Sequence, residues 1–307
     1  MAVLFEGVTK TFAGRAAVRE LRFHVPRGAV YGLLGPNGAG KTTSIRMLVA
    51  ILRPDAGRIL VFGKEPSDEL KDRIGYLPEE RGLYGGMKVL DNLVFFGTLR
   101  GLDTRDARRR AEEWLDRFGL AADAGRKLHE LSKGNQQKVQ LLATVLHEPD
   151  LLLLDEPFEG LDPLNQDLVR GTILELARRG ATIVLSTHRM DEVERLCTHL
   201  TLVHRGRALV EGRLADVKRD HGSDVIGLDF EGDASAIDAH PAVAWASGVG
   251  GSREIRLVPG EDPSEFLAQV AGRVRVRRFE IRAPSLHGIF VRLVERDAEH
   301  SPQEAAH

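Results

Sequence analysis

A glycine-rich run near the N-terminus has the residue types and spacing that bind a phosphate chain. The run is Gly35-Pro36-Asn37-Gly38-Ala39-Gly40-Lys41-Thr42-Thr43. Glycines let successive backbone N–H groups turn toward an anion, and the helix expected next adds unpaired donors and a positive dipole end. Lys41 would supply a point charge for the β- and γ-phosphates, and the Thr42 hydroxyl could bind Mg²⁺. The run predicts a nucleotide site, and a chance glycine turn before a helix is the alternative.

An aliphatic run in the middle of the chain ends in two acidic residues. Four leucines at 151–154 are followed by Asp155 and Glu156. Such a run is typical of a buried parallel strand, whose carboxyl end lies at the sheet edge where ligands bind in open α/β folds. Burying two carboxylates there is costly unless a cation or hydrogen bonds compensate. The pair therefore favours a metal site beside the phosphates.

A histidine is expected at the same edge of the sheet. The run at 182–186 predicts another buried strand, and Thr187 and His188 follow it directly. A lone histidine is more often structural, but at a strand tip beside a phosphate site its ring can bind charge or move protons near neutral pH. We therefore interpret His188 as a functional residue.

Two predicted helix N-termini also carry polar residues that could bind a ligand or cap the helix. The loop at 131–138 opens a helix expected to run to Leu146, and Ser132, Gly134 and the first-turn amides form a second possible phosphate site. Asp162 precedes Pro163, which is the arrangement of an N-cap and a first helical residue.

Strand and helix signals alternate around these groups. Apolar runs predict strands at 3–8, 21–25, 29–34, 58–62, 74–77, 151–155 and 182–186, and a hairpin at 200–210. Helical spacing predicts helices at 44–52, 89–100, 104–118 and 163–179. This alternation predicts an α/β fold with right-handed βαβ units and a largely parallel sheet.

Phe12 is an aromatic residue upstream of the glycine-rich run. It lies in the turn expected around Ala13 and Gly14. An aromatic ring there could pack in the core, or it could stack on a purine base. The sequence leaves these two interpretations open.

Composition limits the class of protein. At 307 residues the chain is longer than a typical single domain, so two domains are expected. Its 43 Lys and Arg against 45 Asp and Glu give a net charge of −2, which offers no support for a nucleic-acid binder. The single cysteine, Cys197, fits a reducing, cytoplasmic setting. No signal peptide and no apolar run of about 20 residues is present, so we expect no direct membrane insertion and any membrane role to require a partner.

Taken in order, the motifs resemble those of the ATP-binding subunit of ABC transporters over roughly residues 3–218. The matching segments are the Walker A loop at 35–43, the signature at 132–136, the Walker B strand at 151–156, the D-loop at 158–162 and the switch histidine His188. The resemblance implies a P-loop NTPase fold of the ABC type, with antiparallel and helical subdomains, that binds and hydrolyses ATP with Mg²⁺.

The resemblance also implies roles for single residues. Phe12 would stack on adenine, and the loop from Asn37 to Thr43, with Lys41, would hold the phosphates. Thr42 and Asp155 would bind Mg²⁺. Glu156 would act as general base on the attacking water, and His188 would contact the γ-phosphate.

One residue of this set departs from the family pattern. Glu79 follows the short strand at 74–77, where the family has glutamine. Its carboxylate could reach Mg²⁺ or water as an amide does, but an unpaired charge there would repel the γ-phosphate.

A second copy is implied as well. Ser132, Gly134 and Asn135 would contact the γ-phosphate of nucleotide bound to the opposite subunit, and Asp162 belongs to the D-loop beside it. Catalysis would need a head-to-tail pair, expected to be a homodimer, with ATP between the subunits. Here Lys133 replaces the usual second glycine of the signature, and Asn135 replaces its glutamine.

The C-terminal part is expected to be a separate α+β domain. Strands are predicted at 225–230, 243–247, 254–258 and 274–281, with helices at 234–239 and 263–271. This β-α-β-β-α-β order predicts a small ferredoxin-like fold, closed by a helix at 285–294. The arginine-rich run at 273–278 fits a solvated strand face better than a site for an anionic ligand. We expect domains at 1–220 and 221–297 and a disordered tail at 298–307.

Function follows from the resemblance. The segment at 284–290 resembles the terminal motif of ATPases from bacterial drug-resistance and sodium-extrusion exporters. The chain is expected to be a cytoplasmic ATPase, peripheral to the inner face of the cell membrane, that powers export by a separate transmembrane ABC permease docked near residues 78–94. The alternative is a non-transport ABC-type ATPase that acts on a ribosome or nucleic acid.

Overall fold

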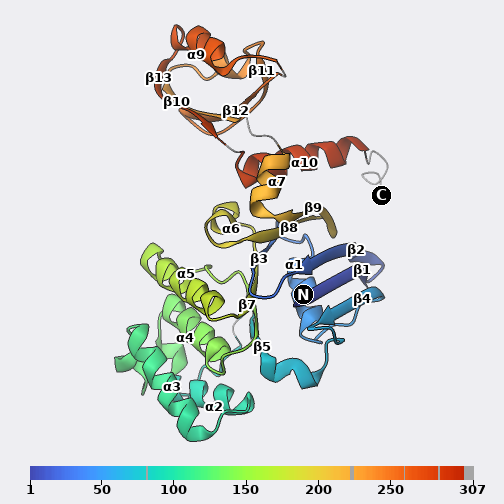
Figure 1. The fold of residues 1–307 in the computed structure, drawn as a ribbon. Coiled ribbons are helices and arrows are strands. Elements are labelled where there is room, and N and C mark those ends of the chain that lie inside the picture. Colours follow the sequence, from blue (N-terminus) through green and yellow to red (C-terminus); the bar gives the residue numbers. More distant parts are fainter. Residues whose placement is uncertain (81, 222–224, 259, 283, 301–307) are drawn as a thin grey trace. The chain divides into compact units, whose positions relative to one another are not determined.

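The chain divides into two compact units. The computed structural model describes residues 1–80, 82–221, 225–258, 260–282 and 284–300, and its first unit is Met1–Gly212 (Figure 1). The second unit begins at Arg213, before helix α7 (Leu214–Asp220), whereas the sequence analysis divides the chain after residue 220. Within the second unit, the Arg292 guanidinium of α10 (Leu286–His300) donates to the His221 carbonyl at the end of α7 at 3.0 Å.

The first unit is built on a mostly parallel sheet with the strand order β5-β6-β7-β3-β8-β9. Its strands are β3 (Val30–Leu34), β5 (Ile74–Leu77), β6 (Leu151–Asp155), β7 (Thr182–Thr187), β8 (His199–His204) and β9 (Arg207–Arg213). The pairs β5–β6, β6–β7, β7–β3 and β3–β8 are parallel, which confirms the predicted βαβ architecture. Every residue of β3, β6 and β7 is buried, as expected for strands covered on both faces.

An antiparallel sheet packs beside this layer, in the order β2-β1-β4. Its strands are β1 (Val3–Phe12), β2 (Arg15–Val25) and β4 (Ala56–Val61). Phe5 stacks on Phe23 with 4.3 Å between ring centroids, and both belong to a core shared with Ile45 of α1 and Leu33 of β3. This core fixes the loop between β3 and α1 against the second sheet.

Helices surround the parallel sheet. They are α1 (Lys41–Leu48), α2 (Val89–Leu99), α3 (Thr104–Arg117), α4 (Lys133–Val145), α5 (Pro163–Arg178) and α6 (Met190–Leu196), with 3-10 turns η1 (Asp68–Arg73), η2 (Ala121–Asp123) and η3 (Leu128–Glu130). Helices α2, α3 and α4 pack on one another as a helical subdomain (Figure 1). Asp103, Ser132 and Asp162 cap α3, α4 and α5 through their side chains.

The second unit has the predicted ferredoxin-like topology. Its strands are β10 (Val225–Glu231), β11 (Val243–Ser247), β12 (Ser252–Leu257) and β13 (Arg275–Arg282), in the antiparallel order β11-β12-β10-β13, with helices α8 (Ser235–Asp238) and α9 (Pro263–Ala271). Ile226 and Ile255 of the sheet pack with Phe266 of α9 in its core.

Two features of the second unit bear on the sequence analysis. Arg275 and Arg277 of β13 form ion pairs with Glu231, which favours a solvated strand face over an anion site. Helix α10 continues to His300, so residues 298–300 are helical and not part of the expected disordered tail. Residues 301–307 lie outside the described part of the chain.

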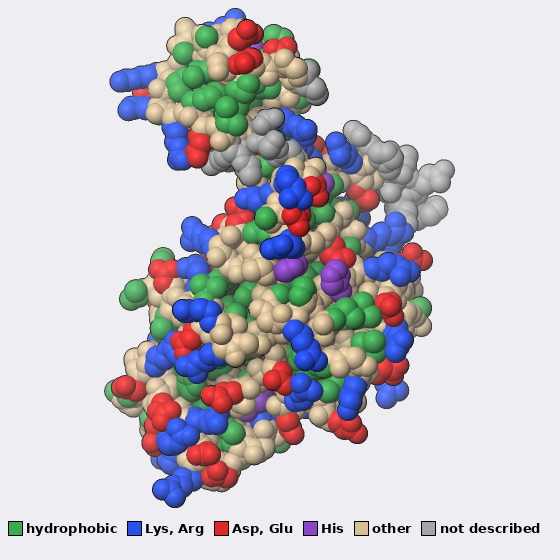
Figure 2. Space-filling view, in the orientation of Figure 1, with side chains coloured by type: hydrophobic (Ala, Val, Ile, Leu, Met, Phe, Trp, Pro, Cys, Tyr) green, Lys and Arg blue, Asp and Glu red, His purple; other side chains and the backbone are tan. Residues whose placement is uncertain are grey.

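The surface carries charges of both signs. Figure 2 shows Lys and Arg side chains interspersed with Asp and Glu over the visible face of the first unit. Among the residues that the structure describes, no helix is long and apolar enough to span a bilayer.

Candidate functional site

The glycine-rich run folds as a tight loop between β3 and α1. Gly38 and Gly40 have φ values of 78° and 103°, which favour glycine. A Cβ atom at Gly40 would lie 2.5 Å from the Ala17 carbonyl oxygen, so a larger residue cannot fit. Gly40 is also the N-cap of α1 and offers no side chain to its first-turn N–H groups. These donors therefore remain available to a bound anion.

The loop surrounds a cavity of about 380 Å³. The cavity is lined by Ala17, Asn37, Gly38, Ala39, Gly40, Lys41, Thr42, Thr43, Glu79 and Glu156. Most of the residues predicted to hold phosphates thus meet in one place, together with two of the acidic residues. The carboxyl ends of β3, β6 and β7 supply this edge, as the parallel order requires.

Lys41 is held in the cavity wall by the loop itself. Its side chain is only 6% exposed, and Nζ donates to the carbonyls of Gly35 at 2.7 Å and Pro36 at 3.1 Å. Glu156 Oε1 lies 3.8 Å from the same ammonium. Burial lowers the pKa of Lys41, and the Glu156 and Asp155 carboxylates act in the opposite direction. The loop therefore presents a single, partly desolvated cation to the cavity.

Asp155 has the features of an incomplete cation site. It is fully buried, and its Oδ1 accepts a hydrogen bond from the Ser186 hydroxyl. Its Oδ2 is buried with no hydrogen-bond partner among the described residues. Burial raises the pKa of Asp155, and the Ser186 and Thr42 hydroxyls oppose the rise. A carboxylate and a hydroxyl beside a phosphate loop form the oxygen donor set that Mg²⁺ uses with phosphates and water.

Glu156 occupies a strained backbone position. Its φ of 48° places a non-glycine residue in the left-handed region, which costs of the order of 1–3 kcal/mol and is typical of functional sites. Its carboxylate accepts hydrogen bonds from the Thr187 hydroxyl at 3.1 Å and the His188 backbone N–H at 3.1 Å. His188 Nδ1 lies 2.9 Å from Oε1, while the imidazole remains half exposed. The predicted base and histidine are therefore paired.

Glu79 reaches the same cavity from the loop after β5. Burial raises the pKa of the Glu79 carboxyl, and the negative charges of Asp155, Glu159 and Glu156 raise it further. Gln140 of α4 holds this loop, because its Nε2 donates to the Pro78 carbonyl at 3.2 Å and the Glu80 carbonyl at 3.1 Å.

Gln140 is not among the residues predicted from the sequence. It is buried in a helix, and its partners lie about 60 residues away in the chain. No local pattern predicts such a contact.

Other predicted residues do not line the cavity. Ser132, Gly134 and Asn135 lie at the exposed or half-exposed start of α4, where Ser132 Oγ accepts from the Asn135 N–H at 3.3 Å. Asp162 caps α5 through the Asn165 N–H at 2.9 Å. Gly134 lies close to Gly160, so the start of α4 and the turn before α5 form one surface.

Phe12 ends strand β1 instead of lying in the turn. Its ring is 46% exposed, which excludes the core interpretation. The Lys10 ammonium lies 5.7 Å from the ring centroid. The ring is therefore accessible to a ligand, although it does not line the cavity.

Comparison with known proteins gives a consistent result. A family model described as "ABC transporter" matches residues 18–159, and another described as "ATP-binding protein DrrA1-3-like, C-terminal domain" matches residues 212–294. These ranges fall in the first and second structural units respectively, apart from one residue at the boundary.

The similarity to individual relatives extends over nearly the whole chain. The uncharacterized ABC transporter ATP-binding protein YhaQ of Bacillus subtilis is 39% identical over 287 residues, covering 94% of this chain and 96% of that protein. The daunorubicin/doxorubicin resistance ATP-binding protein DrrA of Streptomyces peucetius is 34% identical, and the alignment covers 99% of this chain and 96% of that protein. A solved structure, described as the ATP-binding subunit of an ABC transporter, superposes with a TM-score of 0.67 at 30% sequence identity. The superposition covers 72% of this chain and 93% of that one.

Proposed function

Because the chain belongs to the family of ABC transporter ATP-binding proteins, we propose that it hydrolyses ATP to power export by a separate transmembrane permease. The observation that carries the proposal is the single cavity in which the phosphate loop, Lys41 and Glu156 meet. Asp155, whose Oδ2 has no hydrogen-bond partner in the described part of the chain, lies within electrostatic reach of that loop lysine. Catalysis of phosphoryl transfer consists mostly of positioning and charge stabilisation, which these groups can provide.

The loop would bind the triphosphate through its backbone. The N–H groups from Gly38 to Thr43 would hold the phosphate oxygens, and Lys41 would exchange its carbonyl partners for them. Thr42 and Asp155, with Glu79 facing them, would hold Mg²⁺, which when bound neutralises charge on the β- and γ-phosphates. Exposed Phe12 would stack on the adenine.

The carboxylate of Glu156 would orient and deprotonate the attacking water. Thr187 and the His188 backbone fix its two oxygens, so that it keeps one direction relative to the cavity. The imidazole of His188, which is half exposed beside Glu156, would contact the γ-phosphate. A positioned general base of this kind contributes typically 10²–10⁴-fold to a rate.

The magnesium proposal predicts a specific effect of Asp155→Asn. The substitution removes the anionic ligand, so kcat is expected to fall about 100-fold or more, and residual activity should need more Mg²⁺. The thermal unfolding midpoint should stay the same or rise, because the neutral amide avoids the cost of burying a negative charge. That cost is what raises the pKa of Asp155. Phosphate release measured across a Mg²⁺ titration tests this, with Asp150→Asn as control, because Asp150 is exposed and lies just before β6. Wild-type rates at low Mg²⁺ would contradict it.

A second copy of the chain is part of the proposal. Ser132, Gly134 and Asn135 do not line the cavity of their own chain, so they are free to complete the site of another. The surface formed with the turn before α5 would face ATP bound to the other copy. We propose a homodimer with two ATP molecules between the subunits, in which Lys133 adds a positive charge that the usual glycine would lack.

The permease would dock around residues 78–94, as expected from the sequence, and over the neighbouring surface beside β5. A cavity of about 450 Å³ there is lined by residues that include Ile51, Tyr76, Leu99 and Arg100, and the Ile51 and Leu99 side chains are 60% and 62% exposed. Because both line the same cavity, they offer an apolar contact to a protein partner. Asn92 stabilises the adjoining loop through hydrogen bonds with both the N–H and the carbonyl of Tyr84. The chain would then be held at the membrane by its partner.

The docking proposal predicts that Leu99→Asp weakens association with the permease. A charge in a desolvated apolar contact costs enough to reduce capture about tenfold or more. The measurement is copurification of a multispanning membrane protein from mild-detergent extracts, with thermal melting to confirm folding. Leu174→Asp, on α5, is a matched control because that leucine is also exposed. Copurification with ribosomes instead would favour the non-transport alternative.

A further inference from the structure

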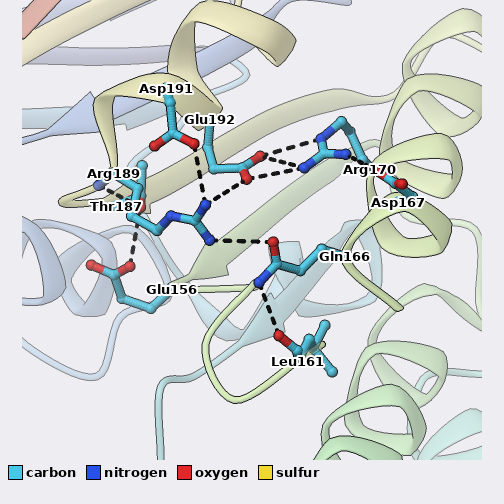
Figure 3. A network of polar contacts seen from close by, with 9 residues as sticks. All are labelled: Glu156, Leu161, Gln166, Asp167, Arg170, Thr187, Arg189, Asp191 and Glu192. Atoms are coloured by element: carbon cyan, nitrogen blue, oxygen red, sulfur yellow. Dashed lines mark hydrogen bonds and ion pairs between the residues drawn. The ribbon is translucent and has the colours of Figure 1, made fainter. Parts of the chain in front are cut away.

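A network of polar contacts connects Glu156 to the turn before α5 (Figure 3). Its members come from the turn between β6 and α5, the end of β7, the start of α6 and the first turns of α5. They are Glu156, Leu161, Gln166, Asp167, Arg170, Thr187, Arg189, Asp191 and Glu192. We call this set the Arg189 network, because Arg189 contacts β7 through Thr187, α5 through Gln166 and α6 through Asp191 and Glu192.

The network is anchored on a buried ion pair. Glu192 is fully buried, and Arg170 donates to it through Nε at 3.2 Å and Nη2 at 3.0 Å. This pairing raises the pKa of Arg170. Arg189 adds a second cation, with Nη2 at 3.2 Å from Glu192 Oε1. Since an unpaired buried carboxylate is costly, this cluster fixes the start of α6 against α5.

The backbone of Arg189 is connected to the Glu156 carboxylate by two hydrogen bonds through the Thr187 hydroxyl. Its N–H donates to Thr187 Oγ1 at 3.1 Å, and that hydroxyl donates to Glu156 Oε2 at 3.1 Å. A carboxylate only accepts, so the single hydroxyl proton points at Glu156 and a lone pair faces Arg189. The direction of the Glu156 carboxylate therefore depends on where the Arg189 backbone lies.

The side chain of Arg189 reaches in the other direction, to α5. Nη1 donates to Gln166 Oε1 at 3.4 Å, and Gln166 Nε2 donates to the Leu161 carbonyl at 2.9 Å. Leu161 belongs to the turn that connects Glu156 to the cap of α5. These hydrogen bonds run from Glu156 through Thr187, Arg189 and Gln166 to Leu161. They therefore link the two ends of the turn at 156–161.

We propose that Arg189 is a positioning residue for ATP hydrolysis, which holds the Glu156 carboxylate and the turn at 157–162 in one arrangement. The inference rests on the proposed function, in which Glu156 directs the water and this turn faces the second copy. Arg189 touches neither cavity nor phosphate loop, so it acts through Thr187 and Gln166. Its loss leaves Glu192 paired with Arg170, so the folded state persists.

The test is a double-mutant cycle in the full-length chain. Arg189→Ala and Gln166→Ala are each expected to lower kcat about tenfold, with the KM for ATP within about twofold, because the phosphate contacts are unchanged. The double variant should be about as slow as the slower single variant, since both break one path. A purely structural role would instead lower the amount of folded protein and leave kcat per folded chain unchanged.

Two further variants sharpen the test. Arg189→Lys keeps a cation beside Glu192, which preserves folding, but one ammonium cannot reproduce the planar fork that contacts Glu192 and Gln166 together, so kcat should still fall. Gln166→Glu keeps the acceptor for Arg189 and loses the donor to Leu161, and it should be as slow as Gln166→Ala. Arg109→Ala, which removes exposed ion pairs on α3, is the control and should retain wild-type kcat.

The inference and the proposed function fail in different ways. A wild-type chain that hydrolyses ATP, together with an Arg189→Ala variant of undiminished kcat, would overturn the role of Arg189 and leave the proposed function intact. Multiplicative losses in the double variant would also overturn it, because they would place the two residues on separate paths.

Discussion

Glu156→Gln is expected to abolish ATP hydrolysis while leaving ATP binding intact. The amide has nearly the same shape and can still occupy the left-handed backbone, but it cannot take a proton from water. We expect kcat to fall about 100-fold or more with little change in nucleotide affinity. Because ATP is no longer consumed, two copies should remain closed around it.

Phosphate release and light scattering with Mg²⁺ and ATP measure the two effects together. Glu148→Gln is a matched control, because Glu148 is an exposed glutamate with a φ of 54° just upstream of β6. The control should hydrolyse ATP at the wild-type rate. Its scattering mass with ATP should not exceed that of the wild type, so no closed dimer accumulates. Turnover near wild type in Glu156→Gln would remove this residue from the mechanism.

Lys41→Ala is expected to weaken ATP binding itself. The substitution deletes the cation that the loop holds at the cavity, and losing one partner of a desolvated charge pair costs about 2–5 kcal/mol. Since 1.4 kcal/mol corresponds to tenfold, the affinity should fall about 30-fold or more. The backbone donors of the loop persist, so weak binding should remain.

Calorimetric titration with ATP under non-hydrolysing conditions measures this loss. Lys138→Ala is the control, since Lys138 is also buried, has a lowered pKa from burial, and donates to the Phe118 carbonyl at 3.3 Å away from the cavity. The control should lose stability and keep its ATP affinity. Unchanged affinity in Lys41→Ala would contradict the role of the loop.

The phosphate loop and the acidic strand end were predictable because their geometry is local. A strand, a glycine turn and a helix start follow one another directly, so spacing alone predicts which groups face a ligand. The parallel order of the sheet then places Asp155, Glu156 and His188 at the same edge as that loop. Longer contacts, such as those of Gln140 and of Arg189 with Gln166, join segments that no local pattern relates.

The first strand, β1, is longer in the structure than the sequence pattern predicts. The alternating pattern breaks near Gly7, which has a φ of 62°, and the pairing with β2 and β4 shifts register there. The predicted strand therefore ends at residue 8, whereas β1 continues beyond the bulge to Phe12. This extension places Phe12 at a strand end with its ring exposed, which the pattern could not decide.

The most direct test of the account is a crystal structure of the Glu156→Gln chain grown with ATP and Mg²⁺. We predict two copies arranged head to tail, with each triphosphate held by Lys41 and the glycine loop of one copy and by Ser132 and Gly134 of the other. A glycine loop left empty at saturating ATP, or Asp155 and Gln at position 156 directed away from the phosphates, would contradict it.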